Sequence, residues 1–129
     1  MDTTQLKRIP LFADASDEEL KQVAYFADAK EVPEGTEVIS EGGFSRELLA
    51  IEEGTAEVTR DGEHVADLGQ GDIFGEAGML DDDMRSATVK ATSRLKLISL
   101  GHFEVKRLKK DAPGVYASIE KLVEERKAR

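Results

Sequence analysis

Apolar residues first recur at helical spacing near the start of the chain. Leu20, Val23, Ala24 and Ala27 fall on one face of a helix drawn through residues 17–28. The four residues before them, Ser-Asp-Glu-Glu at 16–19, form a capping-box pattern, in which a serine and the acid three residues later satisfy the first free amides. We therefore predict a helix over residues 17–28.

Between residues 29 and 100 the pattern changes to short apolar runs separated by glycines. Asp61-Gly62, between the runs 56–59 and 64–68, is the clearest hairpin signal, because a type I′ turn needs positive φ at both central residues. Turns at this spacing, with no helices between most runs, are typical of an antiparallel sandwich or barrel. We interpret the region as an eight-stranded antiparallel jelly-roll β-barrel.

Helical spacing returns after residue 101, in the stretches 102–110 and 113–127. Pro113 suits the first turn of the second helix, where the N–H that proline lacks would have no partner within the helix. Val115, Ile119 and Leu122 are expected on the inner face of that helix. The predicted fold class is therefore mainly β with flanking α: a jelly roll with one helix before it and two after it.

Composition places this fold in a single domain. A chain of 129 residues is long enough for one core, and its lack of cysteine excludes disulfides and thiol chemistry. The start of the chain has no signal-peptide core, and no apolar run approaches the ~20 residues of a membrane span, so we expect a cytoplasmic protein without a membrane partner.

Charge argues against nucleic acid as a partner of this chain alone. The formal net charge is −9, whereas affinity for DNA comes largely from Lys and Arg. Residues 101–129 carry eight basic and five acidic residues, a balance of +3 that leaves −12 for residues 1–100. The basic tail is either ordinary solvated surface or a segment that docks on an acidic partner.

Residues 71–89, Gly-Asp-Ile-Phe-Gly-Glu-Ala-Gly-Met-Leu-Asp-Asp-Asp-Met-Arg-Ser-Ala-Thr-Val, hold most of the candidate chemistry. Gly75 would allow the backbone to approach a ligand, Glu76 supplies an acceptor, and Arg85 supplies a fork-shaped cation. A cyclic phosphate needs amide donors and a cation, and the ribose hydroxyl beside it needs an acceptor. This mixture therefore suits a cyclic nucleotide better than a free phosphate.

The same stretch resembles the phosphate-binding cassette of the cyclic-nucleotide-binding domain family, which includes catabolite-activator-like proteins and regulatory subunits of cyclic-AMP-dependent kinases. Segments resembling other parts of that family occur in the family's order at residues 6–20, 35–42, 48–54, 65–72 and 97–103. The resemblance implies one domain over 1–129: a helical N-terminal part (1–28), the jelly roll (29–100) with its cassette (71–89), and hinge and lid helices (101–129).

The resemblance also implies the site residues. Gly75 and Ala77 would offer backbone amides to the phosphate at a short helix over residues 75–80, and Glu76 would accept the ribose 2′-hydroxyl. Arg85 would bind the exocyclic phosphate oxygens, with Ser86 and Ala87 completing the wall. Taken singly, Glu76 could be an acid favoured at a helix N-terminus, and Arg85 a surface cation beside the aspartates at 81–83.

This chain departs from the family pattern within the cassette. Ala77 and Gly78 stand where relatives usually have a larger aliphatic residue, which weakens the short helix, and Met84 replaces a frequent proline. The aspartates at 81–83 would oppose anion capture, although exposed charges are screened.

Other chemistry has little support. His64 and His102 are far apart in sequence, and surface or capping roles suit them better than metal binding. No hydrolase elbow or Walker loop occurs, so we expect no enzyme activity, no metal and no cofactor besides the ligand.

Two functions remain open from the sequence. One is a sensor of cyclic AMP, or less favourably cyclic GMP, that moves its C-terminal helices and controls an effector protein or effector domain. The other is a jelly-roll interaction domain that no longer binds nucleotide. The last helix could also form an oligomer contact, and a stand-alone protein is not distinguished from the regulatory domain of a larger one.

Overall fold

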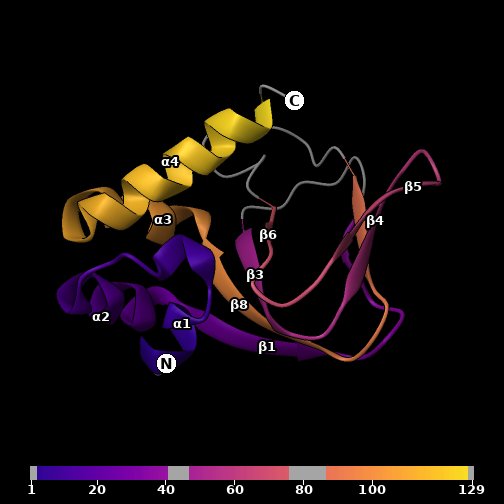
Figure 1. Ribbon diagram of the computed structural model, residues 1–129, viewed down its shortest axis with the longest axis horizontal. Helices are drawn as coiled ribbons and strands as arrows, with labels where there is room; N and C mark the ends of the chain where they lie inside the picture. The colour runs from indigo at the N-terminus through magenta and orange to yellow at the C-terminus, as the bar shows by residue number, and fades with distance from the viewer. Residues whose placement is uncertain (1–2, 41–46, 76–86, 128–129) are drawn as a thin grey trace.

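In the computed structural model, residues 3–40, 47–75 and 87–127 are described. Two four-stranded antiparallel sheets face each other, and the helices lie together on the outer side of one of them (Figure 1). The mainly-β jelly-roll prediction with helices at both ends is confirmed. The predicted short helix at residues 75–80 falls, apart from Gly75, outside the described residues.

The N-terminal part contains more helix than the sequence analysis predicts. Helix α1 (Thr3–Lys7) and the 3₁₀ turn η1 (Pro10–Phe12) precede α2 (Asp17–Phe26). Helix α2 begins where the capping box predicts, and the Ser16 hydroxyl accepts the Glu19 amide at 3.2 Å. It ends two residues early because Ala27 is extended and Asp28 already begins β1.

The first sheet has the order β1-β8-β3-β6, formed by β1 (Asp28–Val32), β8 (Leu95–Gly101), β3 (Glu47–Glu53) and β6 (Ile73–Phe74). The second has the order β2-β7-β4-β5, formed by β2 (Glu37–Ile39), β7 (Thr88–Ala91), β4 (Ala56–Arg60) and β5 (Glu63–Leu68). In Figure 1 the second sheet lies on the side away from the helices.

The hairpin of β4 and β5 confirms the turn predicted from Asp61-Gly62. Both residues have positive φ, 53° and 79°, as a type I′ turn requires, and Arg60 pairs with Glu63 across it. Further along, Val58 pairs with Ala66 but Thr59 pairs with His64, which leaves one extra residue on β5. This bulge re-aims the side chains that follow it.

Two groups of buried apolar residues hold the molecule together. The helix-side cluster fills the space between the helices and the first sheet and comprises Leu6, Ile9, Phe12, Leu20, Val23, Ala27, Leu48, Ala50, Ile73, Ile98, Leu100, Val105, Leu108, Ala112, Val115 and Ile119. The barrel cluster lies between the sheets and comprises Ile39, Leu49, Ile51, Ala56, Phe74, Val89, Ala91, Leu95 and Leu97. Adjacent residues of β3 alternate between the two, so this strand is buried on both faces.

Helices α3 (His102–Asp111) and α4 (Pro113–Lys127) match the predicted C-terminal pair. Val105 and Leu108 of α3, and Val115 and Ile119 of α4, are buried in the helix-side cluster. Leu122 is half-buried and packs against the same cluster, so these residues form the inward-facing side of the helix, and a lid over the base stays a prediction. No helix among residues 3–40, 47–75 and 87–127 is long and apolar enough to cross a membrane.

Candidate nucleotide-binding site

The N-terminal end of the cassette is fixed in the first sheet. Ile73 and Phe74 form β6 and pair with Ala50 and Leu49 of β3. The two β6 side chains point to opposite faces, since Ile73 belongs to the helix-side cluster and Phe74 to the barrel cluster. The cassette therefore begins from a strand that contacts both cores.

The turn before β6 adds backbone contacts to this end. The Gly71 amide donates to the Ile51 carbonyl at 2.8 Å, and the Ile51 amide donates to the Asp72 carbonyl at 2.9 Å. Asp72 Oδ2 accepts the Gly69 amide at 2.7 Å. Gly71 has φ 88°, and a Cβ there would lie 3.2 Å from Pro10 Cδ, so the turn also lies against η1. This end of the cassette is thus joined to β3 and to the N-terminal segment.

Gly75 follows β6 with φ 85°, a conformation that glycine adopts at little cost. It is half-exposed. The positive φ gives a physical reason for glycine at this position, and the approach of a ligand to its backbone stays a prediction. The next four predicted site residues, Glu76, Ala77, Arg85 and Ser86, lie outside the described residues.

The C-terminal end of the cassette is fixed in the second sheet. Ala87 is half-buried and precedes β7, in which Thr88 and Val89 pair with Thr59 and Val58 of β4. Segment 76–86 therefore runs from a strand of one sheet to a strand of the other. Of the predicted site residues, the structure describes only Gly75 and Ala87, one at each end of this segment.

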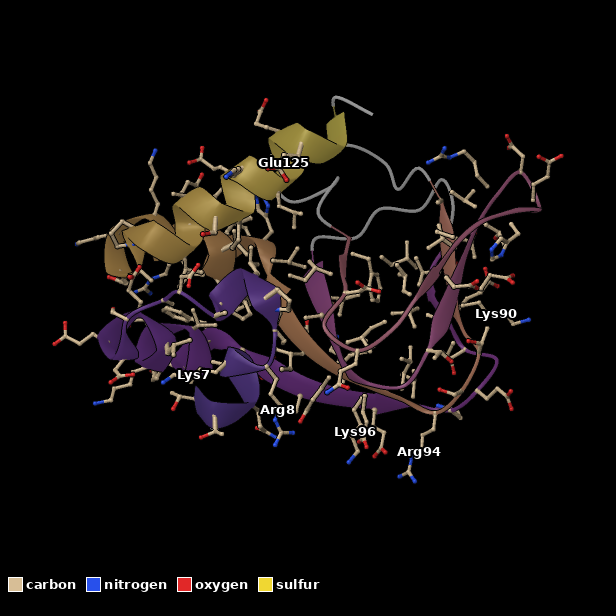
Figure 2. The ribbon with its side chains drawn as sticks, viewed as in Figure 1. Lys7, Arg8, Lys90, Arg94, Lys96 and Glu125 are labelled. Atoms are coloured by element: carbon tan, nitrogen blue, oxygen red, sulfur yellow. The ribbon has the colours of Figure 1, made fainter. Side chains whose placement is uncertain are left out.

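A groove of about 600 Å³ lies beside the start of the cassette. Its described walls come from η1 and the loop after it, from the Gly71–Ile73 turn, and from one side of α4. The side chains are mixed: Leu11 and Leu122 are apolar, whereas Asp14, Lys121 and Glu125 are charged. Figure 2 shows Glu125 on α4. Neither Gly75 nor Ala87 is among the described residues that line this groove.

Three side chains of kinds that can bind metal ions, Glu57, His64 and Asp67, lie together on the outer face of the second sheet. The sequence did not predict this cluster. His64 Nδ1 lies 3.2 Å from Glu57 Oε2, and His64 Nε2 lies 3.5 Å from Asp67 Oδ2. One candidate ligand atom from each residue lies within 4.8 Å of the others. The two carboxylates approach different ring nitrogens. The β5 bulge brings His64 to this face, and neither histidine spacing nor a motif could have indicated it.

Comparison of the sequence with known protein families identifies the family of this chain. The family profile described as "Cyclic nucleotide-binding domain" matches residues 29–111, which run from β1 to the end of α3. The chain belongs to the cyclic nucleotide-binding domain family. The matched range includes both fixed ends of the cassette and all of segment 76–86.

A related sequence with a family domain is the cAMP-dependent protein kinase regulatory subunit of Yarrowia lipolytica. It is 41% identical over 105 residues, which cover 80% of this chain and 28% of the relative. The chain spans about a quarter of the length of the curated kinase regulatory subunits that it matches. The similarity covers one part of these relatives, so it does not show that this chain has the activity of the whole regulatory subunit.

Solved structures of the family share the fold. The Thermus thermophilus catabolite activator protein superposes with a TM-score of 0.82 at 26% identity, covering 91% of this chain and 57% of that one. The regulatory subunit of a cAMP-independent protein kinase A from Trypanosoma brucei superposes with a TM-score of 0.84 at 22% identity, covering 98% and 44%. The fold thus occurs in the regulatory subunit of a kinase described as cAMP-independent, so the fold alone does not identify a ligand.

Proposed function

We propose that this domain binds a cyclic nucleotide, cyclic AMP in preference to cyclic GMP, and converts occupancy into movement of its C-terminal helices. The observation that carries the proposal is the cassette: residues 71–89 lie within the range that matches the family and contain both Glu76 and Arg85. A solved structure that is 28% identical to this chain is described as the regulatory domain of Toxoplasma gondii PKA in a co-crystal with cAMP.

The proposed chemistry divides the ligand among three kinds of group. Amides of Gly75 and Ala77 donate to the cyclic phosphate, and Arg85 pairs with its exocyclic oxygens, because a guanidinium and an oxyanion form strong charge-assisted hydrogen bonds. Glu76 accepts the ribose 2′-hydroxyl. Ser86 and Ala87 close the wall where the chain enters β7.

The positions of the cassette's ends support a mechanical output. A ligand that draws segment 76–86 inward pulls on β6, whose Ile73 side chain is packed in the helix-side cluster with residues of α3 and α4. Repacking at α3 then moves α4 over the base as a lid, which is a population shift between two arrangements. In a longer protein, α3 and α4 would pass this motion to an effector protein or effector domain.

The second candidate is an interaction domain that does not bind nucleotide. Ala77, Gly78 and the aspartates at 81–83 favour it, because they weaken the short helix and add negative charge near the phosphate. The Trypanosoma regulatory subunit, which belongs to a kinase described as cAMP-independent, has the same fold.

Isothermal titration with cyclic AMP and cyclic GMP separates these candidates. Arg85→Leu should lower affinity roughly 30- to 4000-fold, because losing one partner of a desolvated charge pair costs about 2–5 kcal/mol. Arg8→Leu is the control, since the structure leaves Arg8 exposed and Figure 2 shows its side chain pointing away from the fold. No binding by the parent protein, or equal affinity in the parent and Arg85→Leu, would contradict the proposal.

The role of Glu76 has its own test. A 2′-deoxy cyclic nucleotide lacks the hydroxyl that Glu76 would accept, so the parent protein should bind it more weakly than the normal ligand. Glu76→Ala should bind both ligands with nearly equal affinity. The same penalty in parent and variant would remove Glu76 from the ribose.

A further inference from the structure

Helix α4 begins without a cap of its own. Ala112 precedes the helix and has no polar side chain, Pro113 is its first residue, and no acid occurs in its first turn. The first amides of any helix have no partner within the helix and require one from elsewhere. For α4, that partner must come from another part of the chain.

Glu19 of α2 supplies it. Its Oε2 accepts the backbone amides of Gly114 at 2.8 Å and Val115 at 3.2 Å, across 95 and 96 residues of sequence. Its other oxygen lies 3.3 Å from the Ser16 hydroxyl, which donates to it. A carboxylate at this position also interacts favourably with the positive end of the helix dipole. A side chain of one helix therefore caps the other.

Gly114 is part of this contact because it leaves room for the carboxylate. A Cβ built at residue 114 would lie 2.8 Å from Glu19 Oε2 and 3.0 Å from Oε1. An alanine there would displace the end of the Glu19 side chain, while its intrinsic helix propensity exceeds that of glycine. Gly114→Ala thus separates the contact from the stability of α4 itself.

The two halves of α4 have different surroundings. Val115 and Ile119, in the first half, are buried in the helix-side cluster. Lys121 and Glu125, further along, are exposed. The groove beside the cassette runs along both halves, since it is lined by Gly114, Val115 and Ser118 as well as by Lys121, Leu122 and Glu125. The hydrogen bonds from Glu19 are at the N-terminal end of the helix, and the exposed charged side chains lie toward the other end.

The geometry points to Glu19 as the positioning residue that anchors the N-terminal end of α4, so that the helix swings about this end when ligand binds. This inference deepens the proposed function and rests on it for the ligand step, whereas the anchoring itself does not require a ligand. It changes the lid mechanism in one respect: the end of α4 at Gly114 and Val115 stays attached to α2, and closure involves the half beyond Ser118.

Anchoring is tested first in the full chain without nucleotide, by hydrogen exchange resolved to single amides. Glu19→Ala should increase exchange at Gly114 and Val115 about fivefold or more, the change expected when a helix cap is removed. Glu19→Gln should have a smaller effect because its amide oxygen still accepts hydrogen bonds. Glu18→Ala removes a neighbouring exposed charge from the same turn and should leave both amides unchanged. Equal exchange in Glu19→Ala and the parent would overturn the anchoring.

Dissociation of cyclic AMP, followed by stopped flow with a fluorescent analogue, tests the positioning role. Glu19→Ala and Gly114→Ala should both release the analogue about three- to tenfold faster, in keeping with the weight of one cap, with association little changed. If the contact only stabilised α4, the Gly114→Ala variant would release the analogue no faster than the parent protein, because alanine has a higher helix propensity than glycine. Gly62→Ala, at the distant hairpin tip, controls for general loss of stability and should not change release.

Exchange with nucleotide bound gives the direct measure of the pivot. Amides after Ser118 should gain protection, whereas Gly114 and Val115 should change little because they are already hydrogen-bonded. An equal gain at Gly114 and Val115 would overturn the pivot. If the parent binds neither cyclic nucleotide, the proposed function fails, and exchange in the unliganded variants still decides whether Glu19 anchors α4.

Discussion

The two sheets of this jelly roll differ in what covers them. In the first sheet, Leu48, Leu49, Ala50 and Ile51 of β3 are all buried, because helices cover one face and the second sheet covers the other. In the second sheet, β4 has only Ala56 fully buried, and its outer face is left to solvent. Among residues 3–40, 47–75 and 87–127, a change in the helices therefore reaches the barrel through the first sheet.

The cassette links these unequal halves. It leaves the helix-covered sheet at Phe74 and joins the solvent-facing sheet at Thr88. A ligand held by segment 76–86 would contact a loop with one end in each sheet. Ile73 packs among the helices while Val89 packs inside the barrel. The proposed mechanism therefore makes the first sheet the responsive end and the second sheet the fixed support.

The largest expected effects come from the buried strand β8. Leu97→Ala in the barrel cluster and Leu100→Ala in the helix-side cluster should each lower the free energy of unfolding by about 2–5 kcal/mol, through lost burial and a cavity. Val65→Ala, on the half-exposed edge of the second sheet, should change it by less than about 0.5 kcal/mol. Urea denaturation measures all three.

These variants also separate the two cores. Leu100→Ala should raise hydrogen exchange in α3 and α4 more than Leu97→Ala does, since only Leu100 packs on the helix side. The same exchange pattern in both variants would mean that the clusters act as one core.

The next largest effect is expected where the chain crosses between the sheets. Gly54 joins β3 to β4 with φ 105°, and a Cβ there would overlap the Arg94 carbonyl oxygen and lie 3.0 Å from Ser93 Oγ. Gly54→Ala should therefore lower the free energy of unfolding by about 3 kcal/mol, from backbone strain and the overlap together. Gly62→Ala, with positive φ but open space, should cost about 1 kcal/mol. Thermal or urea unfolding that ranks Gly62→Ala as equal or worse would contradict this reading.

Features with local causes were predictable from the sequence. The Ser16 cap and the Asp61-Gly62 turn depend on two to four neighbouring residues, and both form as predicted. The eight strands followed from apolar runs between turns, and the family followed from motifs in order along the chain.

Features that depend on distant contacts were not predictable. The sequence predicts Glu19 as the capping-box acid of its own helix. Its carboxylate instead accepts the amides of Gly114 and Val115, which are 95 and 96 residues away. His64 meets Glu57 only because a bulge shifts the register of β5. Helix α1 has five residues and its Leu6 is buried against other helices, so packing, more than local pattern, defines it. The roles of Glu76 and Arg85 stay predictions.

A smaller effect is expected at the local cap of the helix layer. Ser16→Ala removes the hydroxyl that accepts the Glu19 amide, so the free energy of unfolding should fall by about 1 kcal/mol. If the helices and the first sheet unfold together, this loss will appear in global urea unfolding. If hydrogen exchange increased in α2 while global urea unfolding stayed the same, the helix layer would unfold separately from the sheet.

The smallest effect is expected on the solvent-facing sheet, at His64. Glu57 and Asp67 are directly opposite on neighbouring strands, an unfavourable arrangement for like charges, and His64 lies between them. Lys90 of β7, paired in register with Glu57, also projects from this outer face (Figure 2).

His64→Gln should lower the free energy of unfolding by less than about 0.5 kcal/mol, because exposed ion pairs contribute little. The difference from the parent should shrink further in 1 M salt, where charges are screened within about 3 Å. A loss above about 2 kcal/mol in urea unfolding would mean that the outer face of the second sheet contributes as much as a buried core, and the contrast between the two sheets would not hold.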